Sequence, residues 1–175
     1  FGIVPTSAHT GYGYIEAEMH STGVLPITSF VEKPDKKNAI NMMRSTRYFW
    51  NAGIFLFRAD TFLKELAKHA PEMIDACQKS IDAAVLDTDF VRPDAEAFKV
   101  CPADSIDYAV MEKTERAAMV PLDAGWSDVG SWAELHKVSS KDENNNAVFG
   151  DVVMHDCSDA FIVGTSRLVT AVGMS

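Results

Sequence analysis

The stretch GWSDVGSW, residues 125–132, places a single carboxylate in a tight turn just before a helix start. Ser131 and Glu134 stand at capping-box spacing, which predicts that the helix begins there. Upstream, the apolar run 117–122 predicts a short buried strand. Asp128 therefore lies in a strand-to-helix turn, where α/β proteins often bind ligands. An Asx turn explains an Asp-x-Gly sequence equally well, so this turn alone assigns no function.

Length and composition predict one globular domain. The chain has 175 residues, 47% of them hydrophobic and 23% charged, and a net charge of −9 at pH 7. That charge argues against a nucleic-acid polymer or an anionic membrane as partner. No apolar run approaches the roughly 18 residues of a membrane span, and no stretch resembles a signal peptide, so we expect a cytoplasmic protein. Three widely spaced cysteines favour neither a disulfide framework nor a structural zinc site.

The first candidate ligand position is a glycine-containing loop. Residues 1–5 predict an opening strand, and residues 10–18 read as a loop that runs into a second strand. Gly11 and Gly13 would allow a ligand to approach the backbone closely. A tight turn before a strand is the simpler interpretation of the same glycines.

A second candidate position is the end of the strand predicted for residues 25–34. The strand ends at Glu32 and Lys33 because Pro34 cannot continue the ladder, and Pro34 should keep Lys33 extended. A carboxylate beside an ammonium offers one ligand both a hydroxyl acceptor and a positive charge for phosphate. A solvated strand end is the alternative.

The third candidate is Asn51. A helix is predicted from Asp35 to about Thr46, followed by an apolar run at 54–57 that we expect to form a central strand covered on both faces. An amide at the mouth of such a strand can bind sugar hydroxyls as donor and acceptor. It can equally well satisfy a bent backbone.

The middle of the chain reads as packing elements. Asp60 should cap one helix and Pro71 should open the next. Residues 86–103 are predicted to be irregular, and 105–113 to form a short helix. We expect Asp107 to stabilise the first turn of that helix through its dipole, without a catalytic role.

A change in composition predicts the domain boundary. We expect a domain at 1–139, a polar linker at 140–146, and a separate β-unit at 147–175 built from short apolar strands.

Five ordered motifs together resemble bacterial mannose-1-phosphate guanylyltransferases, of the type often fused to a phosphomannose isomerase. The resemblance extends over nearly the whole chain. The motifs are TGYGYI (10–15), FVEKP (30–34), WNAG (50–53), SIDYAVME (105–112) and WSDVGSW (126–132).

The resemblance implies a fold and a reaction. The fold would be an α/β nucleotidyltransferase domain, with a Rossmann-like mixed sheet and helices on both faces, followed by a left-handed β-helix from about Asn146. The reaction would join mannose 1-phosphate and GTP into GDP-mannose and pyrophosphate.

The resemblance also implies residue roles. Gly13 would bring its backbone close to the sugar, Glu32 and Asn51 would bind sugar hydroxyls, and Lys33 would hold the sugar phosphate. Asp128 would ligate Mg²⁺, so that Lys33 and Asp128 would be the catalytic residues.

The 175 residues depart from the family pattern at one point. The Gly-rich segment with Arg and Lys that cradles the nucleotide phosphates is not found in them, nor is a second metal-binding Asp. We therefore expect a piece of a longer protein that is inactive alone, because losing reactant positioning can remove roughly 7–11 kcal/mol of barrier lowering. The alternatives are a pyrophosphorylase for another hexose 1-phosphate and a non-catalytic sugar-phosphate-binding or assembly fragment. A sheet edge left unpaired where the missing strands would bond favours self-association, for example as a homodimer.

Overall fold

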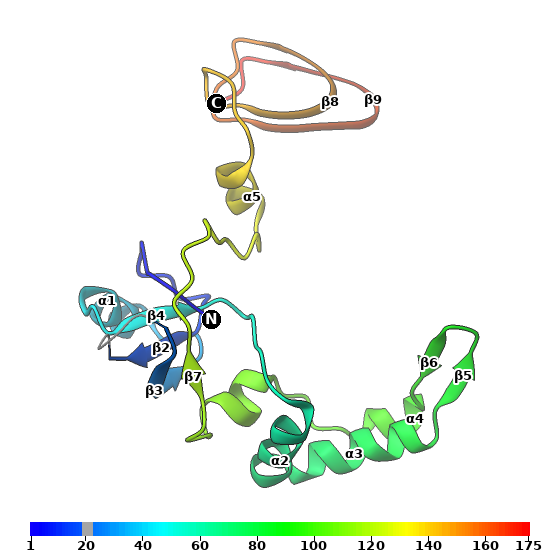
Figure 1. The fold of residues 1–175 in the computed structure, drawn as a ribbon. Helices are drawn as coiled ribbons and strands as arrows, with labels where there is room; N and C mark the ends of the chain where they lie inside the picture. The colour runs from blue at the N-terminus through cyan, green and yellow to red at the C-terminus, as the bar shows by residue number, and fades with distance from the viewer. Residues whose placement is uncertain (19–22) are drawn as a thin grey trace. The chain divides into compact units, whose positions relative to one another are not determined.

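The computed structural model describes residues 1–18 and 23–175, which form two compact units, 1–124 and 125–175 (Figure 1). Each unit has a buried apolar cluster of its own. Within the described part of the chain, none of the helices combines the length and the apolar character needed to cross a bilayer. This division after residue 124 differs from the predicted end of the first domain at residue 139. The predicted domain at 1–139, linker at 140–146 and β-unit at 147–175 stay a prediction.

The first unit is built on a five-stranded sheet with the strand order β1-β4-β2-β3-β7. Neighbouring strands pair antiparallel. Gly2 adds a parallel bridge to Pro121, and this bridge makes the sheet a mixed one. The strands are β1 (Gly2–Ile3), β4 (Tyr48–Asn51), β2 (Tyr14–Ala17), β3 (Leu25–Val31) and β7 (Ala118–Met119). With the helices described below, the chain has the α/β class that the sequence predicts.

An apolar cluster holds the sheet together. It joins side chains from β2, β3, β4 and β7, namely Ile15, Ala17, Leu25, Phe30, Phe49 and Met119. Burying one large apolar side chain stabilises a fold by roughly 1.5–3 kcal/mol. Because the cluster fixes these strands against one another, it also fixes the residues at their ends.

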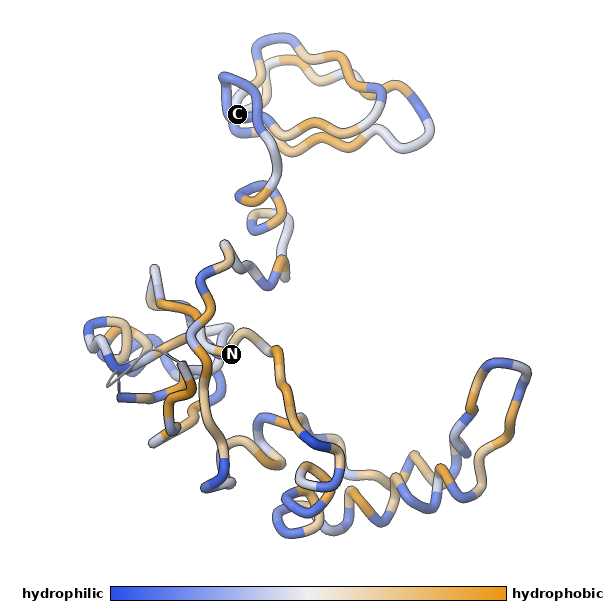
Figure 2. The backbone as a smooth tube through the Cα atoms, in the orientation of Figure 1, coloured by the Kyte–Doolittle hydropathy of each residue, from blue (hydrophilic) through white to orange (hydrophobic). Residues whose placement is uncertain are grey.

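The prediction of a central strand at 54–57 is wrong. β4 ends at Asn51, and the residues Ile54, Leu56 and Phe57 are 45%, 89% and 50% exposed. Figure 2 shows a hydrophobic segment leading from β4 to α2. A strand needs hydrogen-bonded neighbours as well as apolar side chains, and the two neighbours available, β1 and β2, pair with the four residues of β4.

Three helices follow the predicted order. α1 (Lys36–Arg44) is capped by Asp35, whose carboxylate accepts from the Asn38 N–H at 2.8 Å. α2 (Ala59–His69) starts two residues earlier than expected, since Arg58 and not Asp60 is its N-cap and Asp60 lies in the first turn. α3 (Pro71–Asp82) begins with its proline, as predicted.

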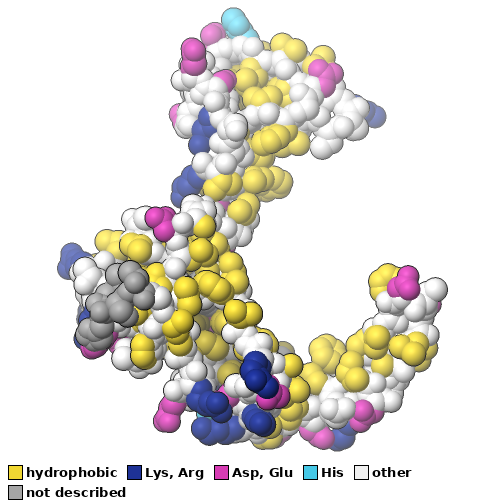
Figure 3. Space-filling model, viewed as in Figure 1, with side chains coloured by type: hydrophobic (Ala, Val, Ile, Leu, Met, Phe, Trp, Pro, Cys, Tyr) yellow, Lys and Arg dark blue, Asp and Glu magenta, His cyan; other side chains and the backbone are white. Residues whose placement is uncertain are grey.

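The prediction of an irregular segment at 86–103 is also wrong. It contains the hairpin strands β5 (Val85–Asp87) and β6 (Phe90–Arg92), and then the helix α4 (Ala95–Lys99). Thr88, at φ +52°, makes the two-residue hairpin turn without the glycine that would have signalled it. Figure 3 shows hydrophobic side chains gathered over this part of the chain. The next element, η1 (Asp107–Met111), is a short π-helical turn at the predicted helix.

The second unit begins with the turn around Asp128 and the helix α5 (Trp132–Val138). Its predicted start is confirmed, because the Ser131 hydroxyl accepts from the Glu134 N–H at 3.2 Å. Two strands follow, β8 (Ala147–His155) and β9 (Phe161–Val172), and they pair in parallel.

The connection between these two strands is unusually short. Parallel neighbours normally need a crossover of a dozen or more residues, whereas residues 156–160 alone separate β8 from β9. The chain must therefore curve within each strand, and Figure 1 shows both strands bent into loops. Coiling of this kind is typical of a β-solenoid. The left-handed β-helix itself stays a prediction.

Candidate functional site

The Gly11–Gly13 loop owes its shape to an aromatic cluster. The rings of His9 and Tyr12 stack at 3.8 Å, and Tyr12 also meets Trp50 edge-on at 5.1 Å. The Gly11 N–H donates to Nδ1 of His9 at 3.1 Å. These contacts bring the loop to the end of β4.

Gly13 lies directly against two of the other predicted site residues. Its carbonyl accepts from the Asn51 N–H at 2.7 Å. A Cβ at this position would lie 2.5 Å from Oε2 of Glu32 and 3.2 Å from Cβ of Asn51. A side chain here would require the Glu32 carboxylate to move, so the glycine lets this loop pack closely against Glu32 and Asn51. Approach of a ligand to its backbone stays a prediction.

Glu32 and Lys33 stand at the end of β3, as predicted, but in a different backbone conformation. Lys33 has φ +48°, so the prediction of an extended backbone before Pro34 is wrong. The chain has to turn sharply there because α1 is capped only two residues later. The Lys33 ammonium lies 3.3 Å from Oε1 of Glu32. The Glu32 side chain is 9% exposed and that of Lys33 59%, so the cation can still reach a ligand.

The Asn51 amide is held at both ends. Its Nδ2 donates to Oδ1 of Asp107 at 3.0 Å, and its Oδ1 accepts from the Gly53 N–H at 3.1 Å. An amide nitrogen has two hydrogens and an amide oxygen two lone pairs. One donor and one acceptor position of Asn51 therefore remain for a ligand, in a defined orientation.

Sequence reasoning missed two acidic residues of this cluster. Asp107 contacts Asn51, instead of serving only a helix dipole, and the Glu112 carboxylate accepts from the Glu32 N–H at 2.9 Å. Burial raises the pKa of the Glu32 carboxyl, Asp107 raises it further, Lys33 opposes the rise and Glu112 adds to it. Both acids belong to the motif SIDYAVME, and their presence in one motif is the signal that could have found them. A helical projection gave no such signal, because it places residues five apart on different faces of a helix.

Asp128 lies in the second unit, away in sequence from this cluster. Its Oδ2 is 2.6 Å from the position that a Cβ on Gly130 would occupy, so a side chain at position 130 would require the carboxylate to move. Val129, between them, has φ +50°. In residues 1–18 and 23–175, no three His, Cys, Asp or Glu side chains are grouped to hold a metal ion. Mg²⁺ is usually held by one or two carboxylates together with substrate phosphates, and a single Asp128 fits that mode.

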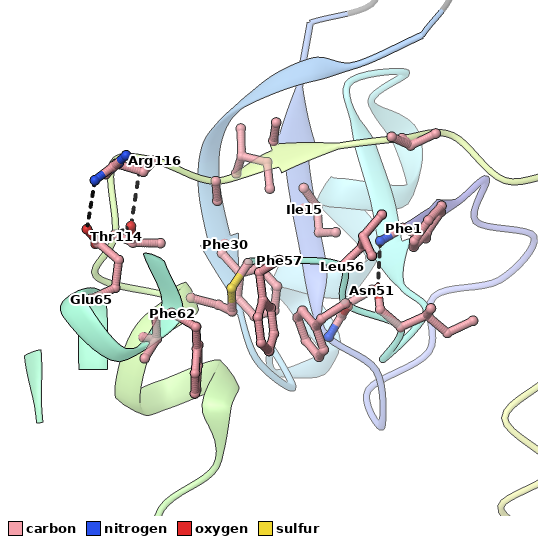
Figure 4. A pocket seen from close by; sticks show the side chains of 18 of the residues that line it. Phe1, Ile15, Phe30, Asn51, Leu56, Phe57, Phe62, Glu65, Thr114 and Arg116 are labelled. Carbon is pink, nitrogen blue, oxygen red and sulfur yellow. Dashed lines mark hydrogen bonds and ion pairs between the residues drawn. The ribbon is translucent and has the colours of Figure 1, made fainter. Parts of the chain in front are cut away.

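An apolar pocket of 370 Å³ lies in the first unit (Figure 4). The rings of Phe57 and Phe62 stack at 4.5 Å in it, and Glu65, at its edge, accepts from the Thr114 hydroxyl at 2.6 Å. Asn51 lines this pocket as well as the polar cluster. A sugar phosphate needs convergent polar groups, so the candidate site is the cluster of Gly13, Glu32, Lys33, Asn51 and Asp107.

Comparison with known proteins identifies a family and several relatives. A nucleotidyl transferase family model matches residues 1–145. The chain is 47% identical over 176 residues to mannose-1-phosphate guanylyltransferase RfbM of Salmonella typhimurium, and 52% identical over 174 residues to the xanthan biosynthesis protein XanB of Xanthomonas campestris. These matches cover 100% and 99% of this chain but 37% of each relative, so the chain spans little more than a third of their length.

Solved structures also resemble the chain. The structure described as mannose-1-phosphate geranyltransferase from Thermus thermophilus matches with a TM-score of 0.82 and 32% identity, over 99% of this chain and 50% of that one. The structure of mannose-6-phosphate isomerase from Helicobacter pylori matches with a TM-score of 0.67 and 32% identity, over 73% of this chain and 51% of that one.

Proposed function

This chain belongs to the nucleotidyl transferase family, and from this premise we propose that it carries the sugar-phosphate half of a mannose-1-phosphate guanylyltransferase site. The observation that supports the proposal most is the convergence of Gly13, Glu32 and Asn51. They come from three separate segments, and Glu32 and Asn51 both lie within 3.2 Å of the Gly13 Cβ position. Together with Lys33 they offer the acceptor, the amide and the cation that a hexose phosphate requires.

In the proposed reaction a phosphate oxygen of mannose 1-phosphate attacks the α-phosphorus of GTP. A new P–O bond forms, the bond from the α-phosphorus to the bridging oxygen breaks, and pyrophosphate leaves. Such transfers depend on positioning and charge neutralisation more than on acid–base chemistry. Glu32 and Asn51 would hold the sugar hydroxyls, the small Gly13 would let the ring approach, and Lys33 would neutralise the attacking phosphate.

For the divalent metal of such a reaction we propose Mg²⁺, with Asp128 as the protein ligand. When bound, the ion would offset negative charge on the nucleotide phosphates. The glycine at position 130 leaves room for the Asp128 carboxylate over the turn.

Calorimetric titration of the purified chain with mannose 1-phosphate tests the proposal. We expect binding that glucose 1-phosphate competes with only weakly, and roughly tenfold or greater weakening in Lys33→Ala, because a charge-assisted contact of about 1.5–3 kcal/mol is lost. Alanine is as disfavoured as lysine at φ +48°, so the backbone cost is matched.

Lys37→Ala is the control, because Lys37 is an exposed lysine on α1 and its loss should leave affinity unchanged. Preference for glucose 1-phosphate would instead indicate a pyrophosphorylase for another hexose. Failure of the folded chain to bind either sugar phosphate would refute the proposal.

A further inference from the structure

The short π-turn η1 and its C-cap residue, Glu112, supply carboxylates to two different residues of the candidate site. Oδ1 of Asp107 accepts from Nδ2 of Asn51 at 3.0 Å, and Oε1 of Glu112 accepts from the backbone N–H of Glu32 at 2.9 Å. One turn of chain therefore contacts the ends of both β3 and β4.

The π geometry is what allows this. The Glu112 N–H donates to the Asp107 carbonyl at 2.9 Å, which is a bond between residues five apart. In an α-helix, residues five apart point about 140° away from each other. The wider turn reduces that angle, and one carboxylate bonds at the end of β4 while the other bonds just after β3.

Asp107 fixes which way the Asn51 amide points. A carboxylate accepts hydrogen bonds and donates none when it is ionised, so it selects the nitrogen end of the amide. The Gly53 N–H, at 3.1 Å, selects the oxygen end. Without Asp107 the amide could rotate, and the free donor and acceptor would no longer have defined places.

Glu112 fixes the neighbouring turn. Its bond to the Glu32 N–H lies immediately before Lys33, whose φ of +48° is unfavourable for a residue with a side chain. Holding the preceding N–H stabilises the turn that presents the Glu32 carboxylate and the Lys33 ammonium together.

The choice of a carboxylate at position 107 has a cost. The Asp107 carboxylate raises the pKa of Glu32 because the two negative charges lie close together and repel each other. A neutral oxygen acceptor could anchor Asn51 without that repulsion, so the positioning role depends on the accepted hydrogen bond and not on the charge.

We propose that Asp107 and Glu112 are positioning residues, which orient Asn51 and the Glu32–Lys33 turn for the hydroxyls and phosphate of a hexose 1-phosphate. This inference rests on the proposed function.

The test is titration of the purified chain and its variants with mannose 1-phosphate and glucose 1-phosphate. Asp107→Ala and Glu112→Ala should each weaken mannose 1-phosphate binding roughly tenfold and reduce the preference over glucose 1-phosphate. Asp107→Asn and Glu112→Gln keep an oxygen acceptor, so they should restore affinity to within about threefold. Glu115→Ala, an exposed acid just beyond η1, should change nothing.

A measurement on the unmodified chain covers the case in which an alanine variant fails to fold. By NMR, the side-chain amide hydrogen of Asn51 that faces Asp107 should exchange at least tenfold more slowly than those of Asn41, which is exposed on α1.

Three results would overturn the inference. The first is an unchanged affinity of Asp107→Ala for mannose 1-phosphate. The second is that the conservative variants lose as much affinity as the alanine variants, for mannose 1-phosphate and glucose 1-phosphate alike. The third is an Asn51 amide that exchanges as fast as that of Asn41. If the unmodified chain binds neither sugar phosphate, the proposed function itself fails, and the positioning role fails with it.

Discussion

Gly13 is the residue at which the site is most sensitive to size. Gly13→Ala would place a methyl group 2.5 Å from Oε2 of Glu32, so that carboxylate has to move. We expect mannose 1-phosphate affinity to fall at least tenfold in calorimetry, with roughly 1–3 kcal/mol of lost stability from overpacking. Gly11→Ala is the matched control, because its Cβ would meet the His9 ring at 3.0 Å and not the acidic cluster. Equal effects of the two substitutions would contradict this explanation.

Glu32 should make stability depend on pH. Its pKa is raised above the ordinary value of 4.5, mainly by burial and then by Asp107. The folded state therefore favours the protonated carboxyl over the ionised one. The free energy that this preference adds to folding is fully present below pH 4.5 and is lost as the pH rises through the raised pKa.

Glu32→Gln should therefore unfold at higher denaturant concentration than the unmodified chain at pH 7.5, with the difference shrinking as the pH falls toward 4.5. Denaturant titrations across this range measure it, and Glu115→Gln provides an exposed control. A difference that does not vary with pH would rule out the electrostatic cause.

At the scale of elements, a buried hydroxyl adds to the backbone bond between α3 and α4, in which the Asp94 N–H donates to the Ser80 carbonyl at 2.9 Å. Ser80 is 1% exposed, and its Oγ donates to the carbonyl of Asp94, the residue that caps α4, at 2.7 Å. Ser80→Ala leaves that carbonyl without its partner and should cost about 1–3 kcal/mol in chemical denaturation. Gln78→Ala, on the exposed side of the same helix, should cost less than about 0.5 kcal/mol. Similar costs for both would show that the hydroxyl does not link the helices.

At the scale of the whole molecule, a substitution that destabilises one unit should leave the stability of the other unchanged. Asn146 is 3% exposed, and its amide bonds with Asp142, with the Cys157 carbonyl and with the Ala160 N–H. Asn146→Ala removes all three bonds and should destabilise residues 125–175 by about 2–4 kcal/mol.

Hydrogen exchange should then show β8 and β9 losing protection while β2, β3 and β4 keep theirs, and mannose 1-phosphate should bind as before. The exposed Asn144, replaced by alanine, is the control. Loss of protection throughout the chain would mean that the two units fold as one.

The sequence by itself determined the features that depend on neighbouring residues. Asp35 and Ser131 cap helices, and Pro71 opens one, because each bond or restriction involves residues at most four positions away. The α/β class and the end of β3 also followed from local patterns, whereas the end of β4 did not, because the apolar run at 54–57 indicated a strand that begins after Asn51. The position of Glu32 after a strand could therefore be predicted, and that of Asn51 as the last residue of β4 could not.

Only the tertiary structure decided which segments meet. Asp107 reaches Asn51 across 56 residues, and Glu112 reaches Glu32 across 80. The apolar run at 54–57 resembles a strand but does not pair as one, because β1 and β2 bond with β4 instead. Strand pairing and the π-turn depend on the register of distant elements, and the composition of any single stretch does not specify that register.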